Sequence, residues 1–138
     1  MKKSLFISLL FCVSFMSHAY YGDPKQQVSH FFTELGKGEI SQAVDNLYAS
    51  NPLAAQKSQE LTLLKQQLGS IEPLYGKFLG SEDMHYEVIS DSVVRVVRMA
   101  KYEQHPVTWE FYFYKPKKTW MISQALFVDQ FQVVDLKK

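Results

Sequence analysis

The residues that could carry out catalysis or bind a metal are few and widely spaced in this chain. Of its four histidines, His30, His85 and His105 form no i, i+4 pair, and no acidic residue joins them at the spacing of metal ligands. The chain contains no Gly-x-Ser-x-Gly turn and no glycine-rich phosphate loop, and its single cysteine is Cys12. The sequence therefore predicts no metal site, no cofactor and no catalytic nucleophile.

Arg98 is the residue with the clearest potential for ligand binding. The alternate positions around it, such as Val96 and Ala100, are apolar, so on a strand they would share a face with it. A guanidinium among apolar side chains needs a partner, because removing it from water is costly. It could anchor an anion or a carbonyl inside an apolar cleft, or it could bond to a helix carboxylate or to helix C-terminal carbonyls. The sequence leaves both alternatives open.

The elements that would position these residues begin with helices. Asp23 is a good N-cap, Pro24 suits the first helical position, and Gln26 completes the spacing of a capping box. Apolar residues then recur at helical spacing until Gly36 interrupts the pattern. Two further helices are predicted, one over residues 39–48 and one from Asn51-Pro52 to about residue 68.

Strands are predicted in the second half of the chain. After Gly69 the period of the apolar residues changes from 3.6 to 2, and β-branched and aromatic residues become frequent. The turns between these runs are short, so consecutive strands should be antiparallel neighbours. Helices followed by such a meander predict an α+β domain, with N-terminal helices packed on a curved antiparallel sheet. The predicted strands cover residues 84–89, 93–102, 107–114 and 119–131, with a short strand near residues 77–79.

The lengths of the turns also predict a register. Glu87 should lie opposite Arg95, and the opposite charges of this pair support the alignment. Arg98 should lie opposite Phe111, and Trp109 opposite Gln124. Because side chains alternate across a sheet, this register divides the residues between two faces, of which the more apolar one should pack beneath the helices.

The apolar face supplies the candidates for a ligand pocket. Its polar groups are Arg98, Gln124 and the hydroxyls of Tyr86 and Tyr102, and Trp109 would form a wall. In the predicted register this face contains no Asp, Glu or His, and so offers no general base near neutral pH. The pocket is therefore predicted to bind and orient a molecule rather than to catalyse a reaction.

The opposite face supplies a candidate surface for self-association. It would carry an apolar and aromatic band that includes Met99, Tyr112, Tyr114 and Met121. An exposed band of this kind is typical of partner surfaces, so a homodimer through this face is predicted. In the alternative, long Lys and Arg side chains and the C-terminal tail cover the band.

The order of these elements resembles the nuclear-transport-factor-two-like superfamily of cone-shaped α+β domains, to which ketosteroid isomerases and polyketide cyclases belong. The likeness is strongest in the hairpin of residues 109–122, where a lysine-rich turn precedes Trp-Met-Ile, as in small exported members. Residues 74–77, Leu-Tyr-Gly-Lys, are also similar. The resemblance covers about residues 23–133 and includes no catalytic motif. It implies a pocket between the helices and the concave face of the sheet, and a dimer through the other face.

The N-terminus has the three parts of a secretory signal peptide. Lys2 and Lys3 precede an apolar run over residues 5–16, and Ser17-His18-Ala19 places small residues before a predicted cleavage site. The run is shorter than the roughly 20 residues that span a bilayer. The sequence thus predicts a signal peptide over residues 1–19, a single domain over residues 20–138, a periplasmic or secreted location, and no membrane span after cleavage.

Composition and charge exclude other classes of protein. With 46% hydrophobic and 14% aromatic residues, the chain is not intrinsically disordered. Without Lys2 and Lys3, the 15 basic residues fall to 13 against 14 acidic residues, a net charge of −1. No basic field is left to hold a nucleic acid. The predicted function is an exported, non-enzymatic domain whose cone pocket binds a small apolar or amphipathic ligand or a protein partner. The alternative is a cyclase- or isomerase-like enzyme acting on a small carbonyl compound.

Overall fold

The computed structural model describes residues 22–136, and the predicted signal peptide lies outside this range. Helices occupy the first half of the described chain, and a four-stranded antiparallel sheet occupies the second half. The α+β class predicted from the sequence is therefore confirmed. The helical elements are α1 (Pro24–Gly36), α2 (Ile40–Tyr48), the 3-10 helix η1 (Ala54–Lys57), α3 (Ser58–Gly69) and α4 (Ile71–Tyr75). The strands are β1 (Phe78–Ser90), β2 (Val93–Tyr102), β3 (Pro106–Tyr114) and β4 (Met121–Val128), followed by the 3-10 helix η2 (Phe131–Val133).

The start of the first helix follows the sequence pattern closely. The Asp23 side chain accepts a hydrogen bond from the Gln26 amide, and the Gln26 side chain accepts one from the Asp23 amide. Pro24 fills the first helical position. The capping box predicted from the sequence is thus confirmed, and it orients α1 where the chain enters the fold.

Two connections differ from the sequence prediction. The third predicted helix is divided into η1 and α3, and the segment after Gly69 contains the short helix α4. The first strand is also longer than predicted, since β1 runs without interruption from Phe78 to Ser90. Both differences arise because short helical turns and irregular edge strands carry little hydrophobic periodicity of their own.

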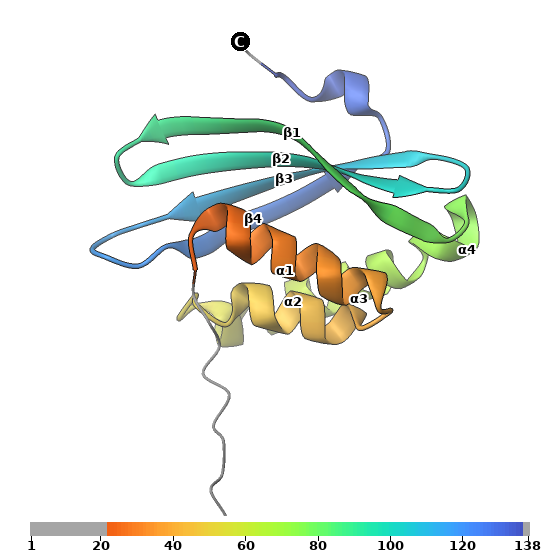
Figure 1. Cartoon of the computed structure of the whole chain (residues 1–138). Helices are drawn as coiled ribbons and strands as arrows, with labels where there is room; N and C mark the ends of the chain where they lie inside the picture. Colours follow the sequence, from red (N-terminus) through yellow and green to blue (C-terminus); the bar gives the residue numbers. More distant parts are fainter. Residues whose placement is uncertain (1–21, 137–138) are drawn as a thin grey trace, which may run out of the picture.

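The strands follow one another in the order β1-β2-β3-β4, and every pair is antiparallel. Figure 1 shows the helices gathered beneath one face of the curved sheet. The C-terminal segment, defined as residues 130–136 and including η2, lies above the opposite face. The two faces of the sheet therefore meet different parts of the chain.

The register between β2 and β3 differs from the prediction by two residues. Glu87 lies opposite Arg95 as predicted, but Arg98 lies opposite Trp109 and not opposite Phe111. A shift by an even number of residues leaves each side chain on its predicted face, because the side-chain period of a strand is two. The assignment of faces in β2 and β3 is therefore unaffected.

The register of β4 reverses the predicted face of the strand's second half. Phe113 pairs with Ile122, whereas Tyr112 pairs with Gln124, so Ser123 is an extra residue in a β-bulge. Beyond the bulge, Phe127 lies opposite Trp109 on the helix side of the sheet. The predicted placement of Gln124 on that face is wrong, because one extra residue moves every later side chain to the other side.

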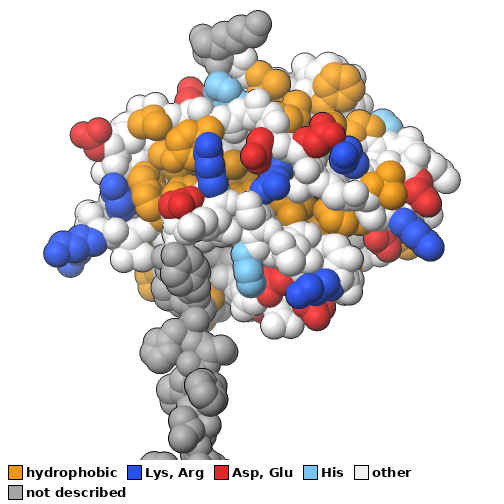
Figure 2. All heavy atoms as spheres, viewed as in Figure 1, with side chains coloured by type: hydrophobic (Ala, Val, Ile, Leu, Met, Phe, Trp, Pro, Cys, Tyr) orange, Lys and Arg blue, Asp and Glu red, His pale blue; other side chains and the backbone are white. Residues whose placement is uncertain are grey.

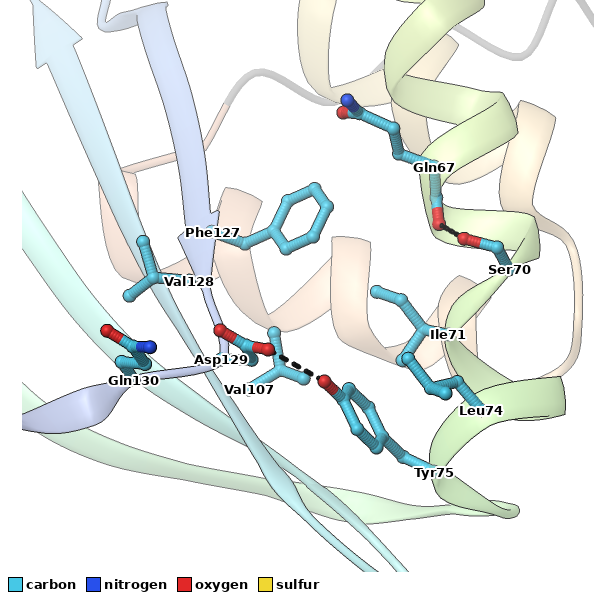
Figure 3. A pocket seen from close by; sticks show the side chains of 10 residues that line it. All are labelled: Gln67, Ser70, Ile71, Leu74, Tyr75, Val107, Phe127, Val128, Asp129 and Gln130. Atoms are coloured by element: carbon cyan, nitrogen blue, oxygen red, sulfur yellow. Dashed lines mark hydrogen bonds between the residues drawn. The ribbon is translucent and has the colours of Figure 1, made fainter.

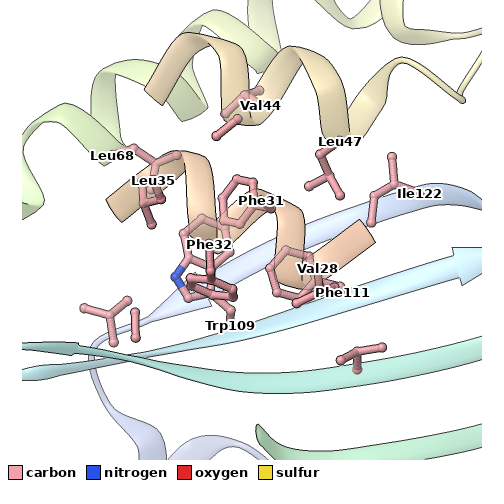
Figure 4. Close-up of a cluster of buried hydrophobic side chains, with 14 of the residues drawn as sticks. Val28, Phe31, Phe32, Leu35, Val44, Leu47, Leu68, Trp109, Phe111 and Ile122 are labelled. Carbon is pink, nitrogen blue, oxygen red and sulfur yellow. The ribbon is translucent and has the colours of Figure 1, made fainter. Parts of the chain in front are cut away.

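Aromatic side chains fill the space between α1 and the middle of the sheet. Phe31 packs edge-on against Trp109 and Phe111, with ring centroids 5.1 Å and 5.6 Å apart, and Phe32 contacts the same two rings. Figure 4 shows these rings between α1 and the strands, with Val28 and Leu35 on the same helix face. The apolar face thus lies beneath the helices as predicted, and it forms a packed core.

The surface view in Figure 2 shows apolar side chains along the sheet, interrupted by charged side chains of both signs. Exposed apolar residues in β1 include Leu79, Val88 and Ile89.

Among the helices of residues 22–136, none combines the length and apolarity that crossing a bilayer would require.

Candidate functional site

Two of the predicted pocket residues belong to the core. Trp109 has no exposed surface, and Tyr102 is buried beside Phe78, with ring centroids 5.6 Å apart. Burial, together with the charge of Glu72, raises the pKa of Tyr102 to about 12. The Trp109 indole Nε1 is buried and has no hydrogen-bond partner among the described residues. The middle of the face beneath α1 is therefore filled by the protein's own rings.

Arg98 is held by three side chains of the protein itself. Its Nη1 donates to the Ser29 hydroxyl of α1 at 2.9 Å, and its Nε lies 3.4 Å from Asp83 Oδ1 of β1. The guanidinium also lies over the Phe32 ring, 5.4 Å from its centroid. Asp83 is largely exposed, so this pair sits at the edge of the sheet. The guanidinium thus bridges α1 and β1.

The remaining pocket candidates lie away from the core. Tyr86 is partly exposed on β1, where the Lys25 ammonium lies 4.8 Å from its ring centroid. Gln124 is exposed on β4, on the face opposite the helices. The structure thus disperses the five predicted pocket residues and does not gather them around one space.

A cleft lies instead at the end of the sheet where β2 turns into β3. It has a volume of about 510 Å³ and separates the α3–α4 corner from the ends of β3 and β4. Figure 3 shows Ile71 and Leu74 facing it from α4, and Phe127 and Val107 facing it from the strands. We name this space the α4 cleft; its other lining residues are Gln67, Ser70, Tyr75, Val128, Asp129 and Gln130.

Two lining residues of the α4 cleft, Tyr75 and Asp129, form a cluster with His105 at its rim. The Tyr75 hydroxyl donates to Asp129 Oδ2 at 2.7 Å, and His105 Nε2 lies 2.7 Å from the Asp129 carbonyl oxygen. Because a carbonyl oxygen only accepts, this His105 nitrogen must carry the proton. The Tyr75 and His105 rings are in contact, with centroids 4.7 Å apart. We name Tyr75, His105 and Asp129 the rim cluster.

The rim cluster ties three parts of the chain together. Tyr75 ends α4, His105 lies in the turn between β2 and β3, and Asp129 follows β4. The backbone strengthens the link, because the Gln104 amide donates to the Tyr75 carbonyl at 2.9 Å. The hydrogen bond to Asp129 raises the pKa of Tyr75 above its usual value, since it favours the protonated hydroxyl. The rim is thus a connected polar edge beside an apolar floor.

Sequence reasoning did not bring the rim cluster together. The sequence singles out His105 only as a histidine without metal-ligand spacing, and it assigns no binding role to Asp129 or Tyr75. The available signal was the Leu-Tyr-Gly-Lys segment at residues 74–77, where Gly76 adopts a positive φ of 83° directly after α4. That turn points to a defined change of direction, but no local pattern links it to residues 105 and 129.

A second depression separates α3 from β4. It has a volume of about 470 Å³, and its lining includes Gln124, Leu64 and the charged residues Lys57 and Glu60. The hydroxyl of Tyr48, another lining residue, accepts a hydrogen bond from the Ala125 amide at 3.1 Å. Because opposite charges lie along its wall, this depression is less suited to an apolar molecule than the α4 cleft.

The face of the sheet away from the helices has its own buried polar cluster. Arg95 Nε donates to Glu110 Oε2 at 2.7 Å, and Arg95 Nη1 lies 3.3 Å from Glu87 Oε2. Nη1 also donates to the Asp135 carbonyl at 2.7 Å, so the guanidinium holds the C-terminal segment. Tyr112 donates to Glu110 Oε2 at 2.9 Å.

The C-terminal segment covers part of the predicted dimer surface. Val97 and Thr108 are buried on this face, and Val134 of the segment is buried as well. Of the four residues proposed for a dimer, Tyr114 is exposed, whereas Met99, Tyr112 and Met121 are partly buried. The C-terminal segment therefore covers the centre of this face, as in the alternative given for the apolar band.

One acidic residue is buried on the helical side of the molecule. Glu34 of α1 accepts a hydrogen bond from Asn46 of α2, and its Oε2 lies 3.4 Å from His30 Nδ1. All these partners belong to helices, so this carboxylate lies between α1 and α2. Within residues 22–136, no three side chains of the His, Cys, Asp and Glu types gather in a way that could hold a metal ion.

No protein-family model, curated protein or solved structure matches this chain. Its class is therefore defined by the fold and the cleft: a small α+β domain, with helices on one face of an antiparallel sheet and an apolar cleft with a polar rim at one end.

Proposed function

We propose that this chain is an exported, non-enzymatic domain that binds a small amphipathic molecule in the α4 cleft. The observation that carries the proposal is the combination of an apolar floor with a polar rim in one space of about 510 Å³. Sites for small molecules are ordinarily concave, mostly apolar, and between roughly 300 and 1,000 Å³ in volume. The space suits a small molecule better than a protein surface.

The floor of the cleft would take the apolar part of the ligand. Val107 and Ile71 are buried there, Phe127 is partly buried, and Leu74 is 64% exposed. Covering such side chains contributes about 25 cal/mol for each Å² of apolar surface removed from water. An apolar molecule lying between Leu74 and Phe127 would therefore be bound mainly by the hydrophobic effect.

The rim would orient the polar part of the ligand. Tyr75 and Asp129 already form a hydrogen bond across the opening, so their positions are set before a ligand arrives. Preorganised polar groups limit the entropy lost on binding. The ligand would thus lie with its polar end at the rim cluster and its apolar part between α4 and β4.

Export and kinship with nuclear-transport-factor-two-like domains are part of the proposal. The signal-like pattern of residues 1–19 supports export. The order of helices followed by an antiparallel meander supports the kinship. Mass spectrometry of the protein from expressing cells tests export, since cleavage after Ala19 gives a chain that begins at Tyr20.

The enzymatic alternative has less support from the described residues. An isomerase-like site needs a carboxylate base enclosed against the bound carbonyl compound. Asp83, the acidic residue beside Arg98, is 74% exposed in its side chain, and Glu34 lies between two helices. Asp129, at the rim of the α4 cleft, is exposed. Binding without chemical change is therefore the function that these positions favour.

Two exposed leucines allow a controlled test. Leu74 lines the α4 cleft and is 64% exposed, whereas Leu79 is 62% exposed on β1 and is not a lining residue. We expect the neutral dye N-phenyl-1-naphthylamine to bind with an increase in fluorescence that saturates at one molecule per chain. Leu74→Asp should weaken this binding about tenfold, because it places a charge at the apolar floor.

Leu79→Asp is the matched control and should leave dye binding within about twofold of the wild type, because surface substitutions away from a site change little. Circular dichroism should show that both variants remain folded. Absence of saturable binding by the wild type, or equal weakening by both substitutions, would contradict the proposal.

A further inference from the structure

We infer that the α4 cleft selects amphipathic molecules whose polar end is positively charged, such as amines with an apolar chain or ring, over the corresponding carboxylates. This inference rests on the proposed function, since it specifies the chemical class of the ligand for the same cleft. It follows from the charges and the hydrogen-bond donors at the rim.

The charge at the rim is negative. Among the described residues that line the cleft, Asp129 is the only one with an ionisable carboxylate or a basic group. Two more carboxylates lie on α4 or next to it: Glu72 of α4 accepts a bond from the Phe78 amide, and Glu103, directly after β2, accepts one from the Lys77 amide, both at 3.0 Å. A cation at the opening would thus be attracted by Asp129 and, at longer range, by two further acids.

The Asp129 carboxylate is held in position with one oxygen turned to a protein donor. Tyr75 bonds to Oδ2, and His105 holds the backbone carbonyl of the same residue. The other oxygen, Oδ1, takes no part in the bond to Tyr75. A carboxylate with a fixed direction and an additional acceptor position is suited to an ammonium group, which only donates.

The hydroxyl donors near the opening are already used. The Tyr75 hydroxyl donates to Asp129, and the Ser70 hydroxyl donates to the Gln67 carbonyl at 2.7 Å, as Figure 3 shows. The remaining polar side chains of the lining, Gln67 and Gln130, are neutral amides. A carboxylate ligand would thus meet a negative charge, without a cation to balance it among the lining residues.

Aromatic rings add to this preference. Tyr75 and Phe127 both line the cleft, from α4 and from β4 respectively. The face of an aromatic ring attracts a cation, because its quadrupole is negative there. An ammonium group between Asp129 and these rings would be attracted by the carboxylate and by the ring faces, whereas an anion would be repelled by both.

The test uses three ligands that share one apolar part and differ in charge: 4-phenylbutylamine, 4-phenylbutanol and 4-phenylbutanoate. NMR titrations at pH 8 and low salt measure each dissociation constant and show whether the backbone amides of residues 71–75, except Pro73, and of residues 127–130 shift. We expect the amine to bind about fivefold more tightly than the alcohol, and the carboxylate to bind more weakly than the alcohol. A difference of this size is typical of a partly exposed pair of opposite charges.

Two substitutions that each remove one negative charge identify the source of the preference. Asp129→Asn should bring the dissociation constants of the amine and the alcohol within about twofold of each other. Asp91→Asn is the matched control, because Asp91 is exposed in the turn between β1 and β2, at the other end of β2 from the cleft. It should leave the fivefold preference unchanged.

The possible outcomes distinguish a failure of this inference from a failure of the proposed function. Saturable binding of the alcohol with equal or tighter binding of the carboxylate would overturn the charge preference and leave the cleft as a ligand site. A preference for the amine that persists in Asp129→Asn would remove Asp129 as its source and overturn the inference. If none of the three molecules shifts the cleft residues, both the inference and the proposed function are wrong.

Discussion

Arg98 shows how a single residue can connect two elements of this fold. Its guanidinium contacts Ser29 on α1, Asp83 on β1 and the ring of Phe32. The sequence left open whether this residue anchors a ligand or is satisfied within the protein. The contacts support the alternative in which Arg98 is bonded within the protein. Its partners are a hydroxyl of α1 and a carboxylate of the edge strand β1, whereas the sequence suggested a helix carboxylate or helix C-terminal carbonyls.

Replacing Arg98 should therefore affect stability and not ligand binding. We expect Arg98→Ala to lower the free energy of unfolding by about 1–2 kcal/mol, because a partly buried charged hydrogen bond and a ring contact are lost. Urea denaturation measures this change. Lys101→Ala is the control, since Lys101 forms an exposed pair with Glu82 at 2.9 Å, and such pairs contribute less than about 1 kcal/mol. A loss of dye binding in Arg98→Ala would favour the ligand anchor.

Ionisation of Tyr102 should make the stability of the domain decrease at alkaline pH. Burial raises the pKa of Tyr102 from 10.0 to about 12 in the folded protein. Between these two values the unfolded chain loses the proton and the folded chain keeps it, so stability falls as the pH rises from about 10 to about 12. We expect Tyr102→Phe, which cannot ionise, to lose less stability across this interval than the wild type.

Denaturation in urea at a series of pH values from 8 to 11.5 measures the dependence. Tyr48 also has a pKa raised by burial, but it is present in both proteins, so the difference between them reports Tyr102. Parallel stability curves for the wild type and Tyr102→Phe would show that Tyr102 ionises alike in the folded and unfolded chains.

At the scale of the elements, the bulge in β4 decides which side chains reach the helical layer. Ser123 stands between Ile122 and Gln124, which pair with consecutive residues of β3. The extra residue turns Phe127 toward Trp109, where the two rings lie 4.8 Å apart, and Phe127 also lines the α4 cleft. The cleft therefore depends on a local irregularity of the edge strand.

Deleting Ser123 should be tolerated, because it removes the extra residue and leaves a regular ladder in which Ile122 and Gln124 keep their partners and their faces. We expect this deletion to lower the free energy of unfolding by less than about 1 kcal/mol. Deleting Leu126, an exposed residue in the regular part of β4, should cost about 3 kcal/mol or more, because it moves Phe127 away from the helical face, as in the loss of a large core side chain. Urea denaturation measures both changes, and a similar cost for the two deletions would contradict this view.

The C-terminal segment is a second element whose position depends on one side chain. Arg95 bonds to the Asp135 carbonyl and to Glu110, and it is buried on the face away from the helices, whereas Glu110 and Glu87 are partly exposed. We expect Arg95→Ala to cost about 3 kcal/mol, because it leaves a partly buried carboxylate unpaired. Hydrogen exchange should also become faster in residues 130–136.

Arg95→Lys provides a comparison that keeps the charge. A lysine has one ammonium and cannot reproduce the fork of bonds from Nε and Nη1, so we expect an intermediate loss of stability. If hydrogen exchange in the C-terminal segment is the same in the wild type and in Arg95→Ala, the segment is held by other contacts.

At the scale of the whole molecule, the C-terminal segment limits how two copies could meet. It covers the centre of the face that the sequence proposed for a dimer and leaves its margin, including Tyr114, exposed. A homodimer through this face stays a prediction. If it forms over that margin, sedimentation velocity gives a dimer for the wild type and a monomer for Tyr114→Glu, whereas a monomeric wild type would remove the prediction.

The sequence alone determined the features that depend on nearby residues. The capping box at Asp23 and Gln26 was predicted because its partners are three residues apart. The change of period after Gly69 predicted helices followed by strands, and the short turns predicted antiparallel neighbours. The pair of Glu87 and Arg95 was predicted because a short turn separates the two strands that carry them.

The tertiary structure decided the features that depend on contacts between distant residues. The predicted pocket is filled because the rings of Phe31 and Phe32 pack against Trp109. The assignment of residues to the two faces of the sheet does not predict how far helix side chains fill the space above it. The bulge at Ser123 placed Gln124 and Phe127 on the faces opposite to those predicted. The rim cluster joins residues 75, 105 and 129, which come together only after the chain has turned back on itself several times. Periodicity reports which side of an element is apolar, but only packing between elements determines which spaces are filled and which stay open.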